Sequence, residues 1–124
     1  MKKIMFVDDD PDQISTVRSI LKYAGADYEI IPAESGKKCF ELLKNNEIPD
    51  LILSDIMMPE MSGWLVFDKL KENSAWKDIP VVFLTARTDK LAECSGKYLA
   101  EDYIEKPVDA EDLKNRIDKV LKKQ

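Results

Sequence analysis

The sequence contains no histidine and only two cysteines. The lack of histidine removes the commonest general base and the usual imidazole metal ligand, and it excludes a phosphohistidine on this chain. With no histidine to complete a zinc site, Cys39 and Cys94 are interpreted as reduced thiols that fill apolar space. Any chemistry must therefore depend on carboxylates, hydroxyls and lysine.

Long apolar runs and an excess of positive charge are also missing. Apolar segments such as residues 51–53 and 81–84 fall far short of the roughly 18 residues that indicate a membrane span. The formal net charge of −5 provides no overall positive field for a phosphate backbone. No secretory segment follows Met1. We therefore expect a cytoplasmic protein that does not bind nucleic acid or a membrane directly.

What the sequence does contain is an alternation of short apolar runs with longer amphipathic segments. The apolar runs lie at residues 4–7, 28–32, 51–54, 80–84 and 102–104. Five helical segments follow them, the first with Ile14, Val17 and Leu21 at helical spacing. This order is typical of an α/β protein with helices on both faces of a parallel sheet. The sequence predicts one (βα)5 doubly wound domain over residues 1–124, with the flavodoxin-like strand order 2-1-3-4-5.

Several residues indicate where the helices begin and end. Asp10 before Pro11 offers an N-cap carboxylate followed by proline at the first helical position. Ser35 and Ser62 are expected to cap the second and third helices. Gly25 is expected to close the first helix in a left-handed conformation.

Chemically distinctive residues follow the ends of four predicted strands. Asp8 and Asp9 follow the first strand, Asp55 the third, Thr85 the fourth and Lys106 the fifth. Because ligands of doubly wound sheets lie beyond the carboxyl ends of the strands, we expect these side chains to share one edge. Neighbouring carboxylates repel one another unless a cation joins them. Magnesium, which prefers hard oxygen ligands, fits this set.

The charges of this predicted site favour phosphoryl transfer. Three carboxylates contribute about −3, while Mg²⁺ and the Lys106 ammonium contribute about +3. A phosphoryl group on Asp55 would then be held by the metal and Lys106, and the Thr85 hydroxyl would donate to one of its oxygens. Such an electrostatic clamp is what phosphoryl transfer requires.

Four motifs occur in the order that is typical of a known family. They are Val-Asp-Asp at residues 7–9, Asp-Ile-Met-Met-Pro-Glu-Met-Ser-Gly at 55–63, Leu-Thr-Ala at 84–86 and Tyr-Ile-Glu-Lys-Pro at 103–107. Together they resemble the receiver domains of response regulators, the phospho-acceptor aspartate family of two-component signal transduction. The resemblance covers essentially the whole chain, and the combination of motifs is specific although each one alone is weak.

The resemblance implies a phosphorylation-activated switch rather than an enzyme. Asp55 would accept a phosphoryl group from a sensor histidine kinase or a histidine phosphotransfer protein, in a Mg²⁺-dependent reaction. Asp9, Asp55 and the Met57 backbone carbonyl would bind the metal, and Asp8 would act mainly through a coordinated water. The chain would pass the signal to a downstream effector as a monomer or a phosphorylation-dependent dimer.

The resemblance also assigns roles around the phosphoryl group. Thr85 and Lys106 would bind its oxygens. Tyr103 would turn inward on activation, and Ala86 would leave room for that ring. The Lys106–Pro107 peptide would be cis, as in the family. The conformational change is expected at the face formed by the fourth helix, the fifth strand and the fifth helix.

The sequence departs from the family pattern in that same region. The interval from Thr85 to Lys106 is one residue shorter than usual, Leu99 replaces a frequent glycine, and Val108 replaces a frequent phenylalanine. Met57 and Arg87 occupy positions that tune the phosphate lifetime in the family. The dimer mode and the partner are therefore left open, as is whether the chain is a stand-alone regulator or one domain of a longer protein.

Three other functions are compatible with parts of the pattern. A phosphatase with an aspartyl-phosphate intermediate generally has a second aspartate where this chain has Met57. A flavodoxin-like electron carrier needs a phosphate-cradling loop after the first strand, where Asp8 and Asp9 would repel a phosphate. A degenerate receiver used only as a scaffold is not favoured, because Asp55, Thr85 and Lys106 are all present.

Overall fold

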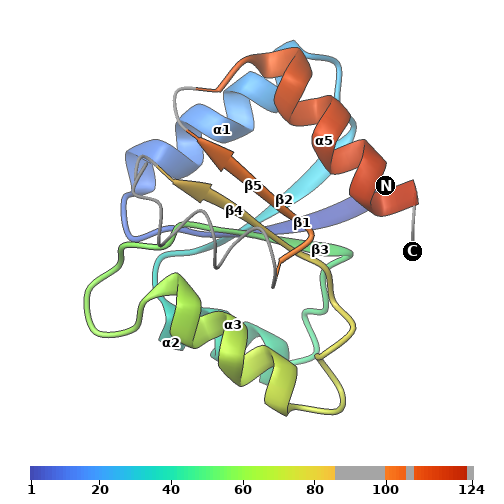
Figure 1. Cartoon of the computed structure of the whole chain (residues 1–124). Helices are drawn as coiled ribbons and strands as arrows, with labels where there is room; N and C mark the ends of the chain where they lie inside the picture. Colours follow the sequence, from blue (N-terminus) through green and yellow to red (C-terminus); the bar gives the residue numbers. More distant parts are fainter. Residues whose placement is uncertain (86–99, 106–107, 123–124) are drawn as a thin grey trace.

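The protein folds around one parallel sheet. The computed structural model describes residues 1–85, 100–105 and 108–122, except for the side chain of Thr85. The strands are β1 (Lys2–Val7), β2 (Tyr28–Ala33), β3 (Leu51–Ser54), β4 (Val81–Thr85) and β5 (Asp102–Glu105). They form a five-stranded parallel sheet in the order β2-β1-β3-β4-β5 (Figure 1). The predicted α/β class, strand order and parallel pairing are confirmed.

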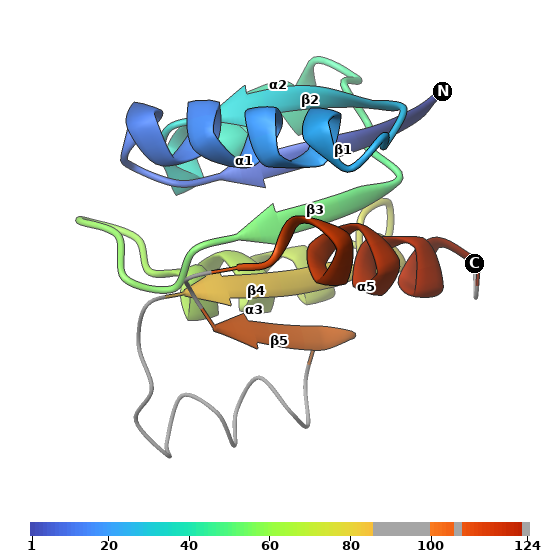
Figure 2. The same cartoon turned by 90° about the horizontal axis from the view of Figure 1, so that it is seen from above.

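Helices cover both faces of the sheet. The described helices are α1 (Pro11–Tyr23), α2 (Gly36–Lys44), α3 (Gly63–Glu72) and α5 (Ala110–Lys122). Figures 1 and 2 show α1 and α5 on one face and α2 and α3 on the other. The predicted fourth helix falls within residues 86–99, outside the described residues. Within the described ranges, no helix combines the length and the apolar character that a bilayer crossing requires.

The alternation of side chains along the strands divides the core into two clusters. Ile4 and Phe6 of β1 join the cluster that includes residues of α1 and α5. Met5 and Val7 join the cluster that includes residues of α2 and α3. All four of these side chains are 0% exposed. Both faces of the sheet are therefore buried, as expected for parallel strands between helical layers.

The predicted helix caps are confirmed. The Asp10 carboxylate accepts a hydrogen bond from the backbone N–H two residues further along, at 2.9 Å. The hydroxyls of Ser35 and Ser62 accept backbone N–H bonds from three residues further along, at 3.0 and 3.3 Å. Gly25 adopts a φ of 80°, the left-handed conformation predicted for it. Local chemistry therefore determines where these helices begin and where α1 ends.

One strand begins earlier than the apolar pattern predicts. β1 starts at Lys2, two residues before the predicted start at Ile4. Lys2 and Lys3 are exposed and pair with β2, while the pairing of β1 with β3 starts at Ile4 and Lys3 exchanges hydrogen bonds with Asp50, just before β3. At this end of β1 the strand pairing continues beyond the region that helices cover on both faces. The first two residues are therefore paired but not apolar, and the apolar pattern did not predict them. The other predicted strand ends lie within one residue of the observed ones.

Cys39 lies in the core with a fully buried side chain, as its interpretation as apolar filler predicted. Burial raises the pKa of the Cys39 thiol from 9.0 to about 12, because the apolar surroundings disfavour the thiolate. The other thiol, Cys94, lies outside the described residues.

This buried thiol is expected to be inert in the folded protein. In a Cys94→Ser background at pH 8, a maleimide should label native Cys39 roughly 100-fold or more slowly than the urea-unfolded chain, because the thiolate is the reactive form. Stability should also fall as the pH rises above 9.0, because the unfolded thiol ionises there while the folded thiol stays protonated up to about pH 12. Native labelling as fast as that of the unfolded chain would contradict this prediction.

Candidate functional site

The register of the sheet brings two aspartates together. Val7 of β1 is paired with Ser54 of β3, so Asp8 and Asp55 leave the sheet side by side. The backbone N–H of Asp55 donates to the Val7 carbonyl at 2.8 Å, and that of Asp8 donates to the Ala33 carbonyl at 3.0 Å. Backbone hydrogen bonding thus continues past the strand ends and fixes the positions from which the side chains of Asp8 and Asp55 extend.

Asp8, Asp9 and Asp55 form an acidic cluster at this edge of the sheet. One carboxylate oxygen from each residue lies within 4.8 Å of the other two. Asp8 is 1% exposed and Asp55 is 9% exposed, while Asp9 is exposed to solvent. The cluster is thus open on the Asp9 side and enclosed around the other two residues.

The donor set of this cluster fits a hard divalent cation. Three carboxylate oxygens at this separation repel one another, and a cation bound between them offsets that repulsion. All three donors are hard oxygens of the kind that Mg²⁺ and Ca²⁺ prefer, and none is a thiolate or an imidazole. The sequence-predicted carboxylates are therefore brought together in an arrangement that suits a metal ion.

Asp8 also organises the turn that leads into α1. Its Oδ1 accepts the backbone N–H of Asp10 at 3.0 Å, and Asp10 in turn caps α1. The carboxylate of Asp10 is not a member of the acidic cluster, consistent with its predicted role as a helix cap. Asp8 therefore links the acidic cluster to the start of the first helix.

The backbone of Asp55 is tightly constrained by Ser54 and Gly63, two residues to which the sequence assigned no role of their own. The Ser54 hydroxyl, fully buried, donates to the Asp55 carbonyl at 2.9 Å. Gly63 donates its N–H to the Ile56 carbonyl at 2.8 Å, and a Cβ on Gly63 would lie only 2.2 Å from the Asp55 carbonyl oxygen. The available signals were a serine that ends a buried apolar strand and a glycine directly after a helix cap.

Other predicted site residues lie partly outside the described residues. Thr85 ends β4 and is paired with Glu105 of β5, so Lys106 would continue from the strand next to Thr85. The side chain of Thr85 and all of Ala86, Lys106 and Pro107 lie outside the described residues. Their predicted roles, including the cis peptide bond, stay predictions.

Met57 and Tyr103 are described, although their predicted roles are not tested. Met57 follows Asp55 in the β3–α3 loop, and its side chain is 55% exposed. Tyr103 of β5 is half-buried and packs against the core cluster on the α2–α3 side of the sheet. The backbone carbonyl of Met57 as a metal ligand and Tyr103 as a switch remain predictions.

Fold and site together define a class of protein. It is a doubly wound parallel α/β domain with a carboxylate cluster beyond the carboxyl ends of two neighbouring strands, where such folds hold their ligands. A family model described as "Response regulator receiver domain" matches residues 4–118. The chain belongs to the response regulator receiver domain family, whose members are regulatory domains of two-component systems.

Curated relatives agree with this assignment. The chain is 42% identical over 116 residues to a probable cyclic di-GMP phosphodiesterase of Vibrio cholerae, and the match covers 92% of this chain and 25% of that protein. It is 36% identical to Histidine kinase P4 of Formosa agariphila, over 95% of this chain and 8% of the kinase. It is 33% identical to the response regulator SaeR of Staphylococcus aureus, over 98% of this chain and 51% of SaeR. The chain thus spans only part of each relative.

Solved structures show the same fold. The N-terminal domain of a response regulator receiver protein from Methanoculleus marisnigri is 40% identical with a TM-score of 0.72, over 98% of this chain and 97% of that one. A response regulator from Desulfuromonas acetoxidans is 31% identical with a TM-score of 0.83, over 98% of both chains. The receiver domain of a histidine kinase from Syntrophus aciditrophicus is 30% identical with a TM-score of 0.82, over 99% and 92%.

Proposed function

We propose that this chain is a phosphorylation-activated switch that accepts a phosphoryl group onto Asp55 from a histidine kinase or a histidine phosphotransfer protein. The receiver domain would extend over residues 1–124, since β1 starts at Lys2 and α5 ends at Lys122. The single observation that carries the proposal is the convergence of three carboxylate oxygens within 4.8 Å at the carboxyl ends of β1 and β3. Membership in the receiver domain family supports the choice of Asp55 as the acceptor within that cluster.

The proposed reaction moves the phosphoryl group from nitrogen to oxygen. A carboxylate oxygen of Asp55 attacks the phosphorus of the donor phosphohistidine, the new O–P bond forms, and the P–N bond breaks with its electron pair left on the imidazole. The product on this chain is an acyl phosphate. The Ser54 hydroxyl and the Val7 carbonyl hold the backbone of Asp55, which limits the positions that the attacking oxygen can take.

Asp8, Asp9 and Asp55 would hold Mg²⁺, together with the Met57 carbonyl. When bound, the metal supplies positive charge that offsets the negative charge of the carboxylates and of the incoming phosphoryl oxygens. Asp8, which is buried and bonded to the Asp10 N–H, keeps its carboxylate in place before the metal binds. Asp9 is exposed, so the proposed site is open to solvent on that side.

The remaining roles complete the proposed switch. Lys106 and Thr85 would bind the phosphoryl oxygens, and Tyr103 would turn inward toward the space that Ala86 leaves. The change would be read at the face formed by the fourth helix, β5 and α5. The support here is that β4 and β5 are neighbours with Thr85 paired to Glu105, so a shift at one strand end directly affects the other.

The test is phosphorylation by a small donor. Incubation with acetyl phosphate and Mg²⁺ is expected to add one phosphoryl group per chain by intact-mass spectrometry, and an excess of EDTA is expected to prevent it. Borohydride reduction, which converts an aspartyl phosphate to homoserine, should place the modification at Asp55 by peptide mapping.

Two results would contradict the proposal. Equal labelling with and without the chelator would mean that the reaction does not depend on the metal. A modification that maps to another residue would mean that Asp55 is not the acceptor.

Sustained hydrolysis of phosphate esters over many turnovers would support the phosphatase alternative instead.

A further inference from the structure

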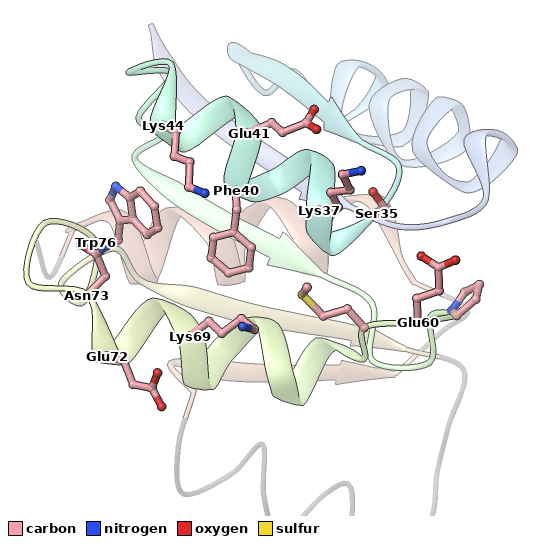
Figure 3. A pocket seen from close by; sticks show the side chains of 12 residues that line it. Ser35, Lys37, Phe40, Glu41, Lys44, Glu60, Lys69, Glu72, Asn73 and Trp76 are labelled. Carbon is pink, nitrogen blue, oxygen red and sulfur yellow. The ribbon is translucent and has the colours of Figure 1, made fainter.

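A groove runs between α2 and α3, on the face of the sheet opposite α1 and α5. It forms an open cavity of about 770 Å³, within the range of about 300–1,000 Å³ that is typical of small-molecule sites. Its floor and walls come from α2, α3, the β3–α3 loop and the segment after α3, as Figure 3 shows. None of the acidic cluster residues lines it, so the groove is separate from the proposed phosphorylation site.

Two aromatic rings form the apolar part of the groove. Phe40 of α2 and Trp76 lie with ring centroids 5.7 Å apart and planes inclined by 32°. Both residues are half-buried and pack against the core cluster, so each keeps part of its surface open to the groove. Met61 extends this apolar surface on the side of the β3–α3 loop. A flat aromatic ligand would gain both buried apolar area and ring contacts here.

Two lysines add positive charge to this apolar surface. Figure 3 shows Lys44 extending from α2 toward α3, and Lys69 on the α3 side below the Phe40 ring. The carboxylates of Glu41 and Glu72 point away from the gap between the helices. Lys37 and Glu60 also line the groove, at the end away from Lys44. Across the described parts of the chain, neither Lys44 nor Lys69 forms an ion pair.

A neighbouring lysine, in contrast, has interaction partners within the chain for its ammonium group. Lys71 lies 5.1 Å from the centroid of the Phe67 ring and donates to the Lys77 carbonyl at 2.9 Å. It does not line the groove. The contrast with Lys44 and Lys69 indicates that these two ammonium groups are available to an anion.

We propose that the groove between α2 and α3 binds a small planar aromatic anion, whose ring contacts Phe40 and Trp76 and whose negative group lies between Lys44 and Lys69. Two sources have this chemistry, an aromatic carboxylic acid and a nucleoside monophosphate. A neutral ring would leave the two ammonium groups unpaired, and an inorganic anion would leave the aromatic surface exposed. Both parts of the ligand are therefore needed for tight binding.

The test is a titration of the isotopically labelled chain followed by NMR, in buffer without divalent cations so that the acidic cluster repels anions. The probes are 2-naphthoate and AMP, with 2-naphthalenemethanol and adenosine as their neutral partners and inorganic phosphate as the anion without a ring. We expect saturable shifts of the Trp76 indole and the Phe40 amide with 2-naphthoate, AMP or both. The indole of Trp64, which packs against Phe83 and does not line the groove, should not shift. The tighter of the two probes identifies the source.

Lysine variants test how much the negative group of the ligand contributes to binding, separately from its ring. The double substitution Lys44→Gln and Lys69→Gln should weaken binding of the anionic probe on the order of tenfold, because each exposed charge pair contributes modestly, and should leave the neutral partner unaffected. Lys71→Gln is the matched control and should bind like the parent chain. The proposal is overturned if no probe gives saturable shifts, if the neutral partners bind as tightly as the anions, or if Lys71→Gln weakens binding as much as the double variant.

Discussion

Replacing Asp55 by asparagine is expected to abolish phosphoryl incorporation from acetyl phosphate while the protein stays folded. The amide has nearly the shape of the carboxylate, but it lacks the negative oxygen that attacks phosphorus. The Asp55 N–H donates to the Val7 carbonyl and the Asp55 carbonyl accepts from the Ser54 hydroxyl, so these hydrogen bonds involve only main-chain atoms of Asp55 and should remain. Intact-mass spectrometry and a thermal melt measure the two effects separately.

The neighbouring aspartates supply graded controls for this result. Asp9→Asn removes a member of the acidic cluster but keeps the acceptor, so labelling should slow and require more Mg²⁺. Asp10→Asn changes a carboxylate outside the cluster and keeps a good helix cap, since asparagine caps about as well as aspartate. Labelling of Asp10→Asn should match the parent chain. If Asp55→Asn were still phosphorylated at the parent rate, Asp55 could not be the acceptor.

The second large effect is expected from Gly63→Ala. An added Cβ would lie 2.2 Å from the Asp55 carbonyl oxygen and 2.8 Å from the Ile56 Cα, and both of these are backbone atoms that cannot move aside alone. We expect a loss of about 2 kcal/mol or more in the free energy of unfolding, at the upper part of the range for overpacked sites. Phosphorylation should slow as well, because the clash displaces the backbone of Asp55. Urea unfolding and the labelling rate give the two readouts.

Gly36→Ala is the matched control. Gly36 is the first residue of α2, as Gly63 is of α3, so both substitutions alter a helix start in the same way. At Gly36 the added Cβ would meet side-chain atoms only, the Met61 sulfur at 2.5 Å and the Val66 Cγ2 at 2.9 Å. The Met61 side chain is flexible and can adjust, and neither contact involves the backbone. If Gly36→Ala destabilised the protein as much as Gly63→Ala, close approach to the Asp55 backbone would not be the cause.

Much of the fold follows from local patterns in the sequence. Apolar runs marked all five strands, and the capping side chains of Asp10, Ser35 and Ser62 marked three helix starts. The start of β1 at Lys2 was missed because it depends on backbone pairing with β2 and not on burial. Hydrophobicity reports burial, and these first two residues are paired but exposed.

The acidic cluster could be predicted from the strand order. Once the strand order is known, parallel strands bring the residues after their carboxyl ends together, so Asp8, Asp9 and Asp55 had to be close. The support around Asp55 was not predictable in the same way. The Ser54 hydroxyl could have bonded elsewhere, and the contact of Gly63 with the Asp55 carbonyl depends on how the β3–α3 loop returns to the strand. The groove depends on the side chains of two separate helices, whose spacing no local pattern contains.

The division of the core into two clusters has a consequence for how such a domain can diversify. Ile4 and Phe6 belong to one cluster, Met5 and Val7 to the other, and the backbone of β1 lies between them. A side-chain change in one layer is accommodated mainly by neighbours in that layer. Mutations that change the surface over α2 and α3 in relatives therefore need not disturb the packing of α1 and α5.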